Sequence, residues 1–357
     1  MAFAKASGYT NLNTGGFSPV IYSKKAQLAF RKSSVVEAVT NTDYAGEIAQ
    51  HGDSVVIVRE PTITINNLER GTTLATQDLT DTSFTMVVDK ANYFAFKMDD
   101  IEEAHSHVNF MDLATNRAAY RLADQHDQEV LGYMAGYKQS SLHSKADALN
   151  TTVNGTKAVS TAGSNELLSS MQLHKDDFGN ITTSSAGTHS IPLAARLPGA
   201  TALPTATASP AMVVARMARL LDQQQVDKQG RWIVVDPVFM EILADEDSRF
   251  MNADFGESGG LRNGLTISNF HGFRVYSSSN LPSLGTGPGT TGTANQLTNF
   301  GVIVAGHDSA VATAEQINKT ETYRDPDSFA DIVRGMHLYG RKILRPEAIV
   351  TARYNAA

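Results

Sequence analysis

The chain has 357 residues, no cysteine and a formal net charge of −7, with 41% hydrophobic and 19% charged residues. This composition is typical of a folded chain of one to three domains. The lack of cysteine excludes disulfides, thiolate nucleophiles and cysteine zinc sites. The acidic total argues against tight wrapping of DNA or RNA, and no apolar run is long enough to cross a bilayer, so we expect no membrane partner.

Residues 1–51 are predicted to form an N-terminal arm and not part of a core. They are polar and contain glycine, with one short apolar patch at Phe17 to Tyr22. Segments of this kind at a chain end are poorly ordered unless something holds them down. The charges that precede Glu37 are all basic, on Lys5, Lys24, Lys25, Arg31 and Lys32.

Acidic residues gather instead in the segment DDIEE, Asp99 to Glu103, and the stretch from Arg334 to the end is again basic with Glu347 as its one acid. Basic ends on an acidic body suggest electrostatic pairing within one copy or between copies of the chain. A patchy, solvated surface explains the same distribution equally well. Both interpretations stay open at this point.

Residues 52–98 are predicted to form a long two-stranded β-arm. GDSVVIV and TITI have the composition and alternation of strands, ERGTT supplies a glycine turn, and SFTMVVD with NYFAFKMDD forms the returning strand. Phe94, Phe96 and Met98 are placed on one face of it. Its base is apolar and its tip polar, so the arm has too little apolar surface to stabilise itself and must lean on another surface.

The strongest helical pattern runs from Asn109 to Ala135, within a predicted segment 99–140. Its length is about 40 Å at ~1.5 Å per residue, which suits a strut. One stripe at helical spacing is predicted to be buried: Met111, Ala114, Ala118, Leu122, Val130 and Met134. The other faces carry Asp112, Arg117, Arg121, Asp124, Gln125, Asp127 and Gln128.

Residues 141–205 are rich in Ser, Thr, Ala, Asn and Gly, which predicts a surface insertion or a long connection. Residues 206–335 follow the pattern of a mixed α+β domain, and 336–357 supply a closing strand. Within 206–335, a helix is predicted to begin with Ser209 as its N-cap and Pro210 at its first position. The strand RWIVV that follows is predicted to place Trp232 in a core. The buried side of that helix is predicted to hold Met212, Val213, Met217, Leu220 and Leu221.

Motifs that would carry catalysis are matched by letter only. GESGG around Ser258 lacks the preceding strand and following helix of a nucleophile elbow. GPGTTG from Gly287 lies in turn-forming sequence, unlike a dinucleotide fingerprint. DDIEEAHSH offers carboxylates with His105 and His107, yet no further ligand follows at a recognisable spacing, and a charged corner is the better interpretation. We therefore expect no enzyme activity and no cofactor.

The order of these parts resembles the major capsid protein of tailed bacteriophages, the HK97-like fold. The resemblance covers nearly the whole chain, and its most specific pieces are GDSVVIVREPTITIN, DKANYFAFKMDDIEEAHSHVN and VRGMHLYGRKILRPEAIVTAR. It implies an α+β fold with an N-terminal arm (1–51), an extended E-loop hairpin (52–98), a peripheral domain with a spine helix (99–140, closed by 336–357) and an axial domain (206–335).

The same resemblance implies a virion shell protein that assembles in the bacterial cytoplasm as pentamers and hexamers, with a separate scaffolding protein and a portal, around double-stranded DNA that it does not bind tightly. The E-loop would lean on a neighbouring subunit. In relatives that crosslink, a Lys on the E-loop is joined to a neighbour, and the absence of Lys between Glu60 and Asp89 predicts no such crosslink. The predicted contact residues between subunits are Lys24, Lys25, Arg31, Lys32, Arg59, Glu69, Arg70, Asp99, Asp100, Glu102 and Glu103.

Three alternatives remain. A nanocompartment shell of the same fold would enclose enzyme cargo instead of DNA, and the sequence hardly separates it from a phage capsid. A phage tail protein or a cytosolic enzyme with a dimerisation arm is less favoured, because no convergent acid, base or nucleophile set is present.

Overall fold

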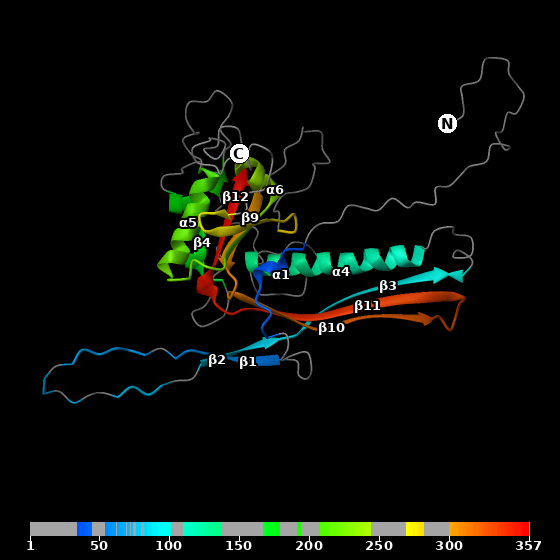
Figure 1. Ribbon diagram of the computed structural model, residues 1–357, viewed down its shortest axis with the longest axis horizontal. Coiled ribbons are helices and arrows are strands. Elements are labelled where there is room, and N and C mark those ends of the chain that lie inside the picture. Colours follow the sequence, from blue (N-terminus) through cyan, green and yellow to red (C-terminus); the bar gives the residue numbers. More distant parts are fainter. Residues whose placement is uncertain are drawn as a thin grey trace, which may run out of the picture.

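The computed structural model describes residues 34–44, 54–61, 63–68, 70–71, 73, 76–79, 82–100, 110–136, 167–173, 175–178, 191–193, 208–243, 269–281 and 300–356. Within these ranges the strands form sheets of seven, three and two strands. Figure 1 shows a body around the largest sheet, an extended limb in which a long helix lies along the three-stranded sheet, and the two-stranded hairpin beneath them.

The seven-stranded sheet is the centre of the body and has helices on both faces. Its strand β6 (Arg231–Val235) is buried along its whole length. Ile233 and Val235 pack with α5 (Pro210–Gln223) and α6 (Pro237–Leu243), whereas Trp232 and Val234 face α1 (Val36–Val39) and the end of α4 (Phe110–Ala135). The remaining strands are β4 (Gln172–Leu173), β5 (Ile191–Leu193), β7 (Asn269–Phe270), β8 (Phe273–Ser277), β9 (Phe300–His307) and β12 (Ile349–Ala356).

The three-stranded sheet is antiparallel and has the order β10-β11-β3. Its strands are β10 (Val311–Arg324), β11 (Ala330–Ile343) and β3 (Lys90–Asp99). Helix α4 lies along one face of it (Figure 1), and Tyr339 and Ile343 share a buried cluster with Leu131 and Met134 of the helix. Because the end of α4 also packs on the large sheet, this helix connects the two sheets.

Two direct passages join the sheets, from β9 into β10 and from β11 into β12 through the short helix η5 (Pro346–Ala348). The two passages touch, because the carbonyl of Ala310 accepts hydrogen bonds from the amides of Leu344, at 2.8 Å, and Arg345, at 3.2 Å. The predicted boundary between 335 and 336 therefore does not separate the sheets. Strand β10 lies beside β11 in the limb, and β12 lies in the large sheet.

The base of the predicted β-arm is a two-stranded hairpin, in which β1 (Ser54–Arg59) pairs antiparallel with β2 (Thr82–Val87). Two expectations were wrong. The described residues between 60 and 81, Ile63 to Ile65 of TITI included, form no strand, because alternation without a cross-strand partner makes no sheet. The stretch NYFAFKMDD belongs to β3 and pairs with β11 instead of with β1.

The alternation within β3 was predicted correctly, since Phe94, Phe96 and Met98 are more buried than their neighbours. The same alternation would be seen with either partner strand, so the pattern could not identify β11 as the partner of β3. Where β2 crosses β11, the two backbones approach at Gly340. A β-carbon there would lie 2.7 Å from the carbonyl oxygen of Val87, so this crossing requires glycine.

The long helix extends over Phe110–Ala135, as predicted, but its faces differ from the expectation. Val130 and Met134 are buried, whereas the earlier members of the predicted stripe are only partly covered, because the first half of α4 lies beside the limb alone. Asp124 and Asp127, placed on the solvent side, are buried. In α5, Val213, Met217 and Leu221 are buried as expected, but Met212 is exposed.

Residues 141–205 were predicted to be a surface insertion or a long connection. Their described part instead contributes to the core: β4 and β5 pair in parallel with β12, and Leu167, Met171 and Ile191 are buried. These apolar residues are few and lie within a mostly polar stretch, so its overall composition did not predict that they are buried. Several other predicted features lie outside the described residues: Lys24, Lys25, Arg31, Lys32, Glu69, Glu102, Glu103, His105, His107 and the motifs GESGG and GPGTTG.

Candidate subunit interface

The hairpin and the segment that joins its strands expose an unusual amount of apolar surface. Ile65 is 95% exposed, and it lies in a segment that extends away from the rest of the molecule (Figure 1). Exposed apolar groups of this density mark contact sites in soluble proteins. The large exposed apolar residues of this region are Val56, Val58, Ile63, Ile65, Leu68, Leu79 and Val87.

Strand alternation divides the hairpin into a covered and an uncovered face. Val55, Ile57, Phe84 and Met86 turn toward the β10–β11 ribbon and pack with Leu338 and its neighbours. The opposite face carries Val56, Val58 and Val87, which remain exposed. Contacts within the chain thus cover only one face of the hairpin at its base, and the apolar side chains of the other face are left exposed.

A second exposed apolar surface lies on the face of the limb opposite the buried residues beneath α4. Tyr93 and Met336 are directly opposed in the β3–β11 register, and both are exposed. Tyr323 contributes to the same face, with the Arg334 guanidinium 4.9 Å from the centre of its ring. Phe329, in the turn between β10 and β11, is 80% exposed.

The acidic corner after β3 already has a partner in its own chain. The Asp100 carboxylate accepts two hydrogen bonds from Arg324, which also pairs with Asp331 at 3.3 Å. Nearby, Lys97 donates to Asp325 at 2.7 Å, and this ion pair, with help from the Ser328 hydroxyl, holds the pKa of Asp325 well below its usual range. Asp99 is exposed, and so is Arg70 in the turn with Gly71. The contact roles predicted for these residues stay predictions.

A buried polar network, which the sequence analysis missed, fixes the start of α1, within the predicted N-terminal arm, to α4. The Asp127 carboxylate accepts hydrogen bonds from the Ser34 hydroxyl and from the amides of Val35 and Val36, at 2.9, 2.9 and 3.0 Å. The Asn280 amide donates to Asp127 at 2.8 Å and to Asp124 at 2.9 Å. The signal was present: Asp127 precedes Val130, Leu131 and Met134 at helical spacing, on the buried stripe.

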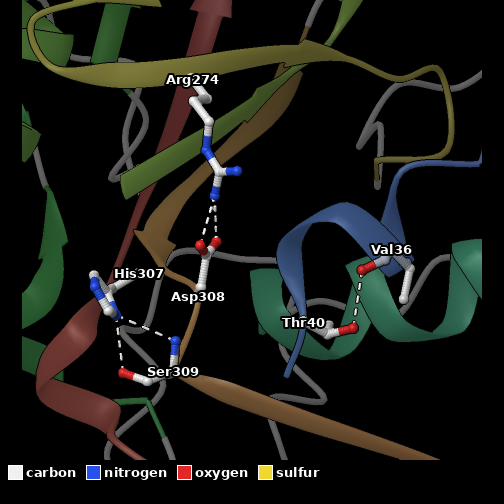
Figure 2. A network of polar contacts seen from close by, with 6 residues as sticks. All are labelled: Val36, Thr40, Arg274, His307, Asp308 and Ser309. Carbon is white, nitrogen blue, oxygen red and sulfur yellow. Dashed lines mark hydrogen bonds and ion pairs between the residues drawn. The ribbon is translucent and has the colours of Figure 1, made fainter. Parts of the chain in front are cut away.

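The turn between β9 and β10 joins body and limb, and Figure 2 shows its contacts. Arg274 of β8 donates to both oxygens of Asp308, at 2.5 and 2.7 Å. His307 Nδ1 lies 2.9 Å from the Ser309 hydroxyl and also accepts the Ser309 backbone amide, at 3.2 Å. Because His307 accepts a hydrogen bond from the backbone of its own turn, its contacts with Ser309 stabilise that turn. We do not interpret them as the nucleophile–base pair of a catalytic site.

A buried carboxylate outside these regions, that of Asp236, has a structural role. Burial raises the pKa of Asp236, whose carboxylate accepts hydrogen bonds from the Tyr354 hydroxyl, at 2.5 Å, and from the Phe239 amide at the start of α6. Among the described residues, no cluster of three His, Cys, Asp or Glu side chains is placed to hold a metal ion. None of the described helices is both long and apolar enough to span a bilayer.

Comparisons with known proteins agree on one family. A family model described as phage capsid protein matches residues 80–352. Among solved structures, Mycobacterium phage Che8 is similar at 23% identity, with 94% of this chain and 97% of that chain covered and a TM-score of 0.64. The capsid of cyanophage P-SCSP1u is similar at 16% identity, with 100% and 99% covered and a TM-score of 0.65. No curated protein sequence matches the chain.

The capsid of an empty GTA particle is also similar, at 14% identity with a TM-score of 0.56, and 99% of this chain and 100% of that chain are covered. These likenesses span whole chains and give the fold, whereas the family model covers well over half of the sequence. The chain belongs to the phage capsid protein family, has the HK97-like fold and is a major capsid protein that forms the phage shell.

Proposed function

We propose that this shell is icosahedral, is built from pentamers and hexamers of the chain, and encloses double-stranded phage DNA. The observation that carries the proposal is the exposed apolar segment with Ile63, Ile65, Leu68 and Leu79, which extends beyond the molecule's own core. Such a segment is stable in water only when another molecule covers it. Identical subunits that cover one another in turn form closed symmetric assemblies.

Within such a shell each part of the chain has a role. The hairpin and its connecting segment act as the E-loop, which rests on a neighbouring subunit. Helix α4 with β3 and the β10–β11 ribbon acts as the peripheral domain, and the body around the seven-stranded sheet acts as the axial domain. Residues 1–51 form the arm, and the buried contact of Asp127 with Val35 and Val36 fixes the α1 segment of this arm on its own subunit.

The partners follow from the same proposal. A separate scaffolding protein and a portal take part in assembly, which occurs in the cytoplasm of the host bacterium. The net charge of −7 supports a container whose wall does not bind the packaged DNA tightly. The protein acts by assembly alone, without catalysis and without a cofactor.

Electron microscopy of the protein, expressed with and without its neighbouring genes, tests the icosahedral proposal directly. We expect closed icosahedral shells when a scaffolding protein is present. Shells wide enough for a phage genome support the DNA container, whereas uniformly small shells would identify a compartment for protein cargo. Small soluble oligomers alone, even beside the scaffolding candidate, would contradict the proposal.

We further propose that the basic arm of one subunit pairs with the acidic corner of another. Reversing Lys24, Lys25, Arg31 and Lys32 to Glu should lower shell yield, because each exposed ion pair contributes about 0.2–1 kcal/mol. Adding the complementary changes Asp99→Lys, Glu102→Lys and Glu103→Lys should restore the yield.

Asp100 is left unchanged in that experiment because it pairs with Arg324 in its own chain. Reversing Arg219 and Lys228 to Glu, on the exposed surface of the body, matches the change in total charge of the double reversal of Lys24 and Lys25 and serves as its control. An unchanged yield after reversal of the four arm residues would rule out this contact. A loss that the complementary changes fail to repair would show that the arm's partner lies elsewhere.

A further inference from the structure

Two histidines meet in the interior where α4 lies on the ribbon. His126 comes from α4 and His337 from β11, and they are 8% and 5% exposed. Their ring centres are 5.1 Å apart and nearly perpendicular. Tyr339 completes the cluster, with its ring centre 4.6 Å from that of His126 and 5.0 Å from that of His337.

The hydrogen bonding of this cluster is incomplete on both histidines. His126 Nε2 and His337 Nδ1 are buried and have no hydrogen-bond partner. His337 Nε2 lies 3.2 Å from the Glu315 carboxylate of β10, and the Tyr339 hydroxyl donates to Glu129 of α4. A buried imidazole without an acceptor for a second proton favours the neutral form, because a buried charge needs a partner.

The charged groups around His126 come from every element of the junction. Asp127 and Glu129 lie on its own helix, Glu315 lies on β10, and His337 lies on β11. Arg341 of β11 donates to the backbone carbonyl of Glu129, and Lys90 of β3 lies opposite Tyr339 in register. The carboxylates favour a proton on His126, but burial and the neighbouring His337 oppose it more strongly, and together they lower the pKa of His126 to about 4.

We propose that the His126–His337 pair is a proton-sensitive contact between α4 and the ribbon, so that acid weakens the packing of the helix on the limb. When α4 separates from β11, His126 reaches water and regains its ordinary affinity for protons. The separated state therefore binds more protons than the packed state. By linkage, the packed state loses stability relative to the separated state as the pH falls from about 6.5 toward 4. Below about pH 4 both states bind the proton, and the lost stability is not recovered.

Hydrogen exchange measured by mass spectrometry on the full chain tests this inference without any substitution. Protection factors, in which the intrinsic pH dependence of exchange is divided out, report the opening of α4 and β11 separately from that of β9. With the pKa of His126 at about 4 in the packed state, protection of residues 120–135 and 333–341 should fall roughly 30-fold between about pH 7.5 and about pH 5. Protection of β9 should fall much less.

Two variants move the effect in opposite directions. His126→Phe keeps an aromatic ring against Tyr339 and removes the titrating group, so the extra fall in protection should disappear. Glu315→Gln, at a half-exposed side chain, removes a carboxylate that favours a proton on His126, so protection should fall further below about pH 5. Equal pH dependence of α4 and β9 in the natural chain, or an unchanged fall in His126→Phe, would overturn the proposal.

Discussion

Joining β1 directly to β2 by an Asn-Gly turn in place of residues 60–81 should give a folded subunit that no longer forms shells. The register pairs Arg59 with Thr82, so a two-residue turn closes the hairpin without strain. The covered face of the hairpin, with Ile57 and Met86, stays packed on the ribbon. Only the segment proposed to cover a neighbour is lost.

The expected size of this effect follows from the apolar side chains alone. Burying one large apolar side chain contributes about 1.5–3 kcal/mol. Ile63, Ile65, Leu68 and Leu79 together would therefore contribute about 6–12 kcal/mol per subunit, which corresponds to a loss of more than about four orders of magnitude in contact affinity. Replacing these four residues by Ser, with the segment kept at full length, should abolish shells nearly as completely as the deletion.

Sedimentation and electron microscopy measure shell formation, and circular dichroism with thermal melting measures the fold of the subunit. Asn66→Ser with Asn67→Ser is the matched control, because these exposed residues lie in the same segment and are already polar. The control should assemble as the natural chain does. Shells of normal yield from the fourfold Ser variant would show that the segment does not carry the contact.

The sequence pattern predicted those elements whose partners are local or whose period is long. Helix α4 was placed within one residue of its observed bounds, and the strand with Trp232 was correctly identified as buried, because long helical periodicity and continuous apolar runs have few alternative structures. The resemblance to the capsid fold rested on the order of such elements. That order survives at 23% identity or less, where individual residues differ.

What the sequence could not show is which segments meet. Strand β3 alternates in the same way whether its partner is β1 or β11, and only the break at Val88 and Asp89 separates it from the hairpin. Asp124 and Asp127 were placed on the solvent-facing side of the helix, yet both are buried and accept hydrogen bonds from Asn280, more than 150 positions away. The helical spacing of Asp127 places it on the buried stripe, but nothing in the period of one sequence shows which distant segment pairs with it.

Asp127→Ala should destabilise the subunit by about 3–5 kcal/mol and free the α1 segment of the N-terminal arm. The Asp127 carboxylate accepts from Ser34, Val35, Val36 and Asn280 while it is fully buried. Removing it leaves several buried donors without an acceptor, and each such donor costs about 1–3 kcal/mol. Asp127→Asn retains one oxygen for the amides of α1, so its effect should be smaller.

Urea unfolding gives the change in stability, and hydrogen exchange with limited proteolysis locates it. Protection of residues 34–41 should fall first, and proteolysis within this segment should increase, because α1 is held to α4 through this carboxylate. Asp43→Ala is the matched control, since Asp43 follows α1 closely in the sequence and is exposed. It should change the stability of the subunit by less than about 0.5 kcal/mol. If the two variants unfolded alike and kept their arms equally protected, Asp127 would not be the anchor of the arm, and α1 would depend on its apolar contacts through Val36 and Val39 alone.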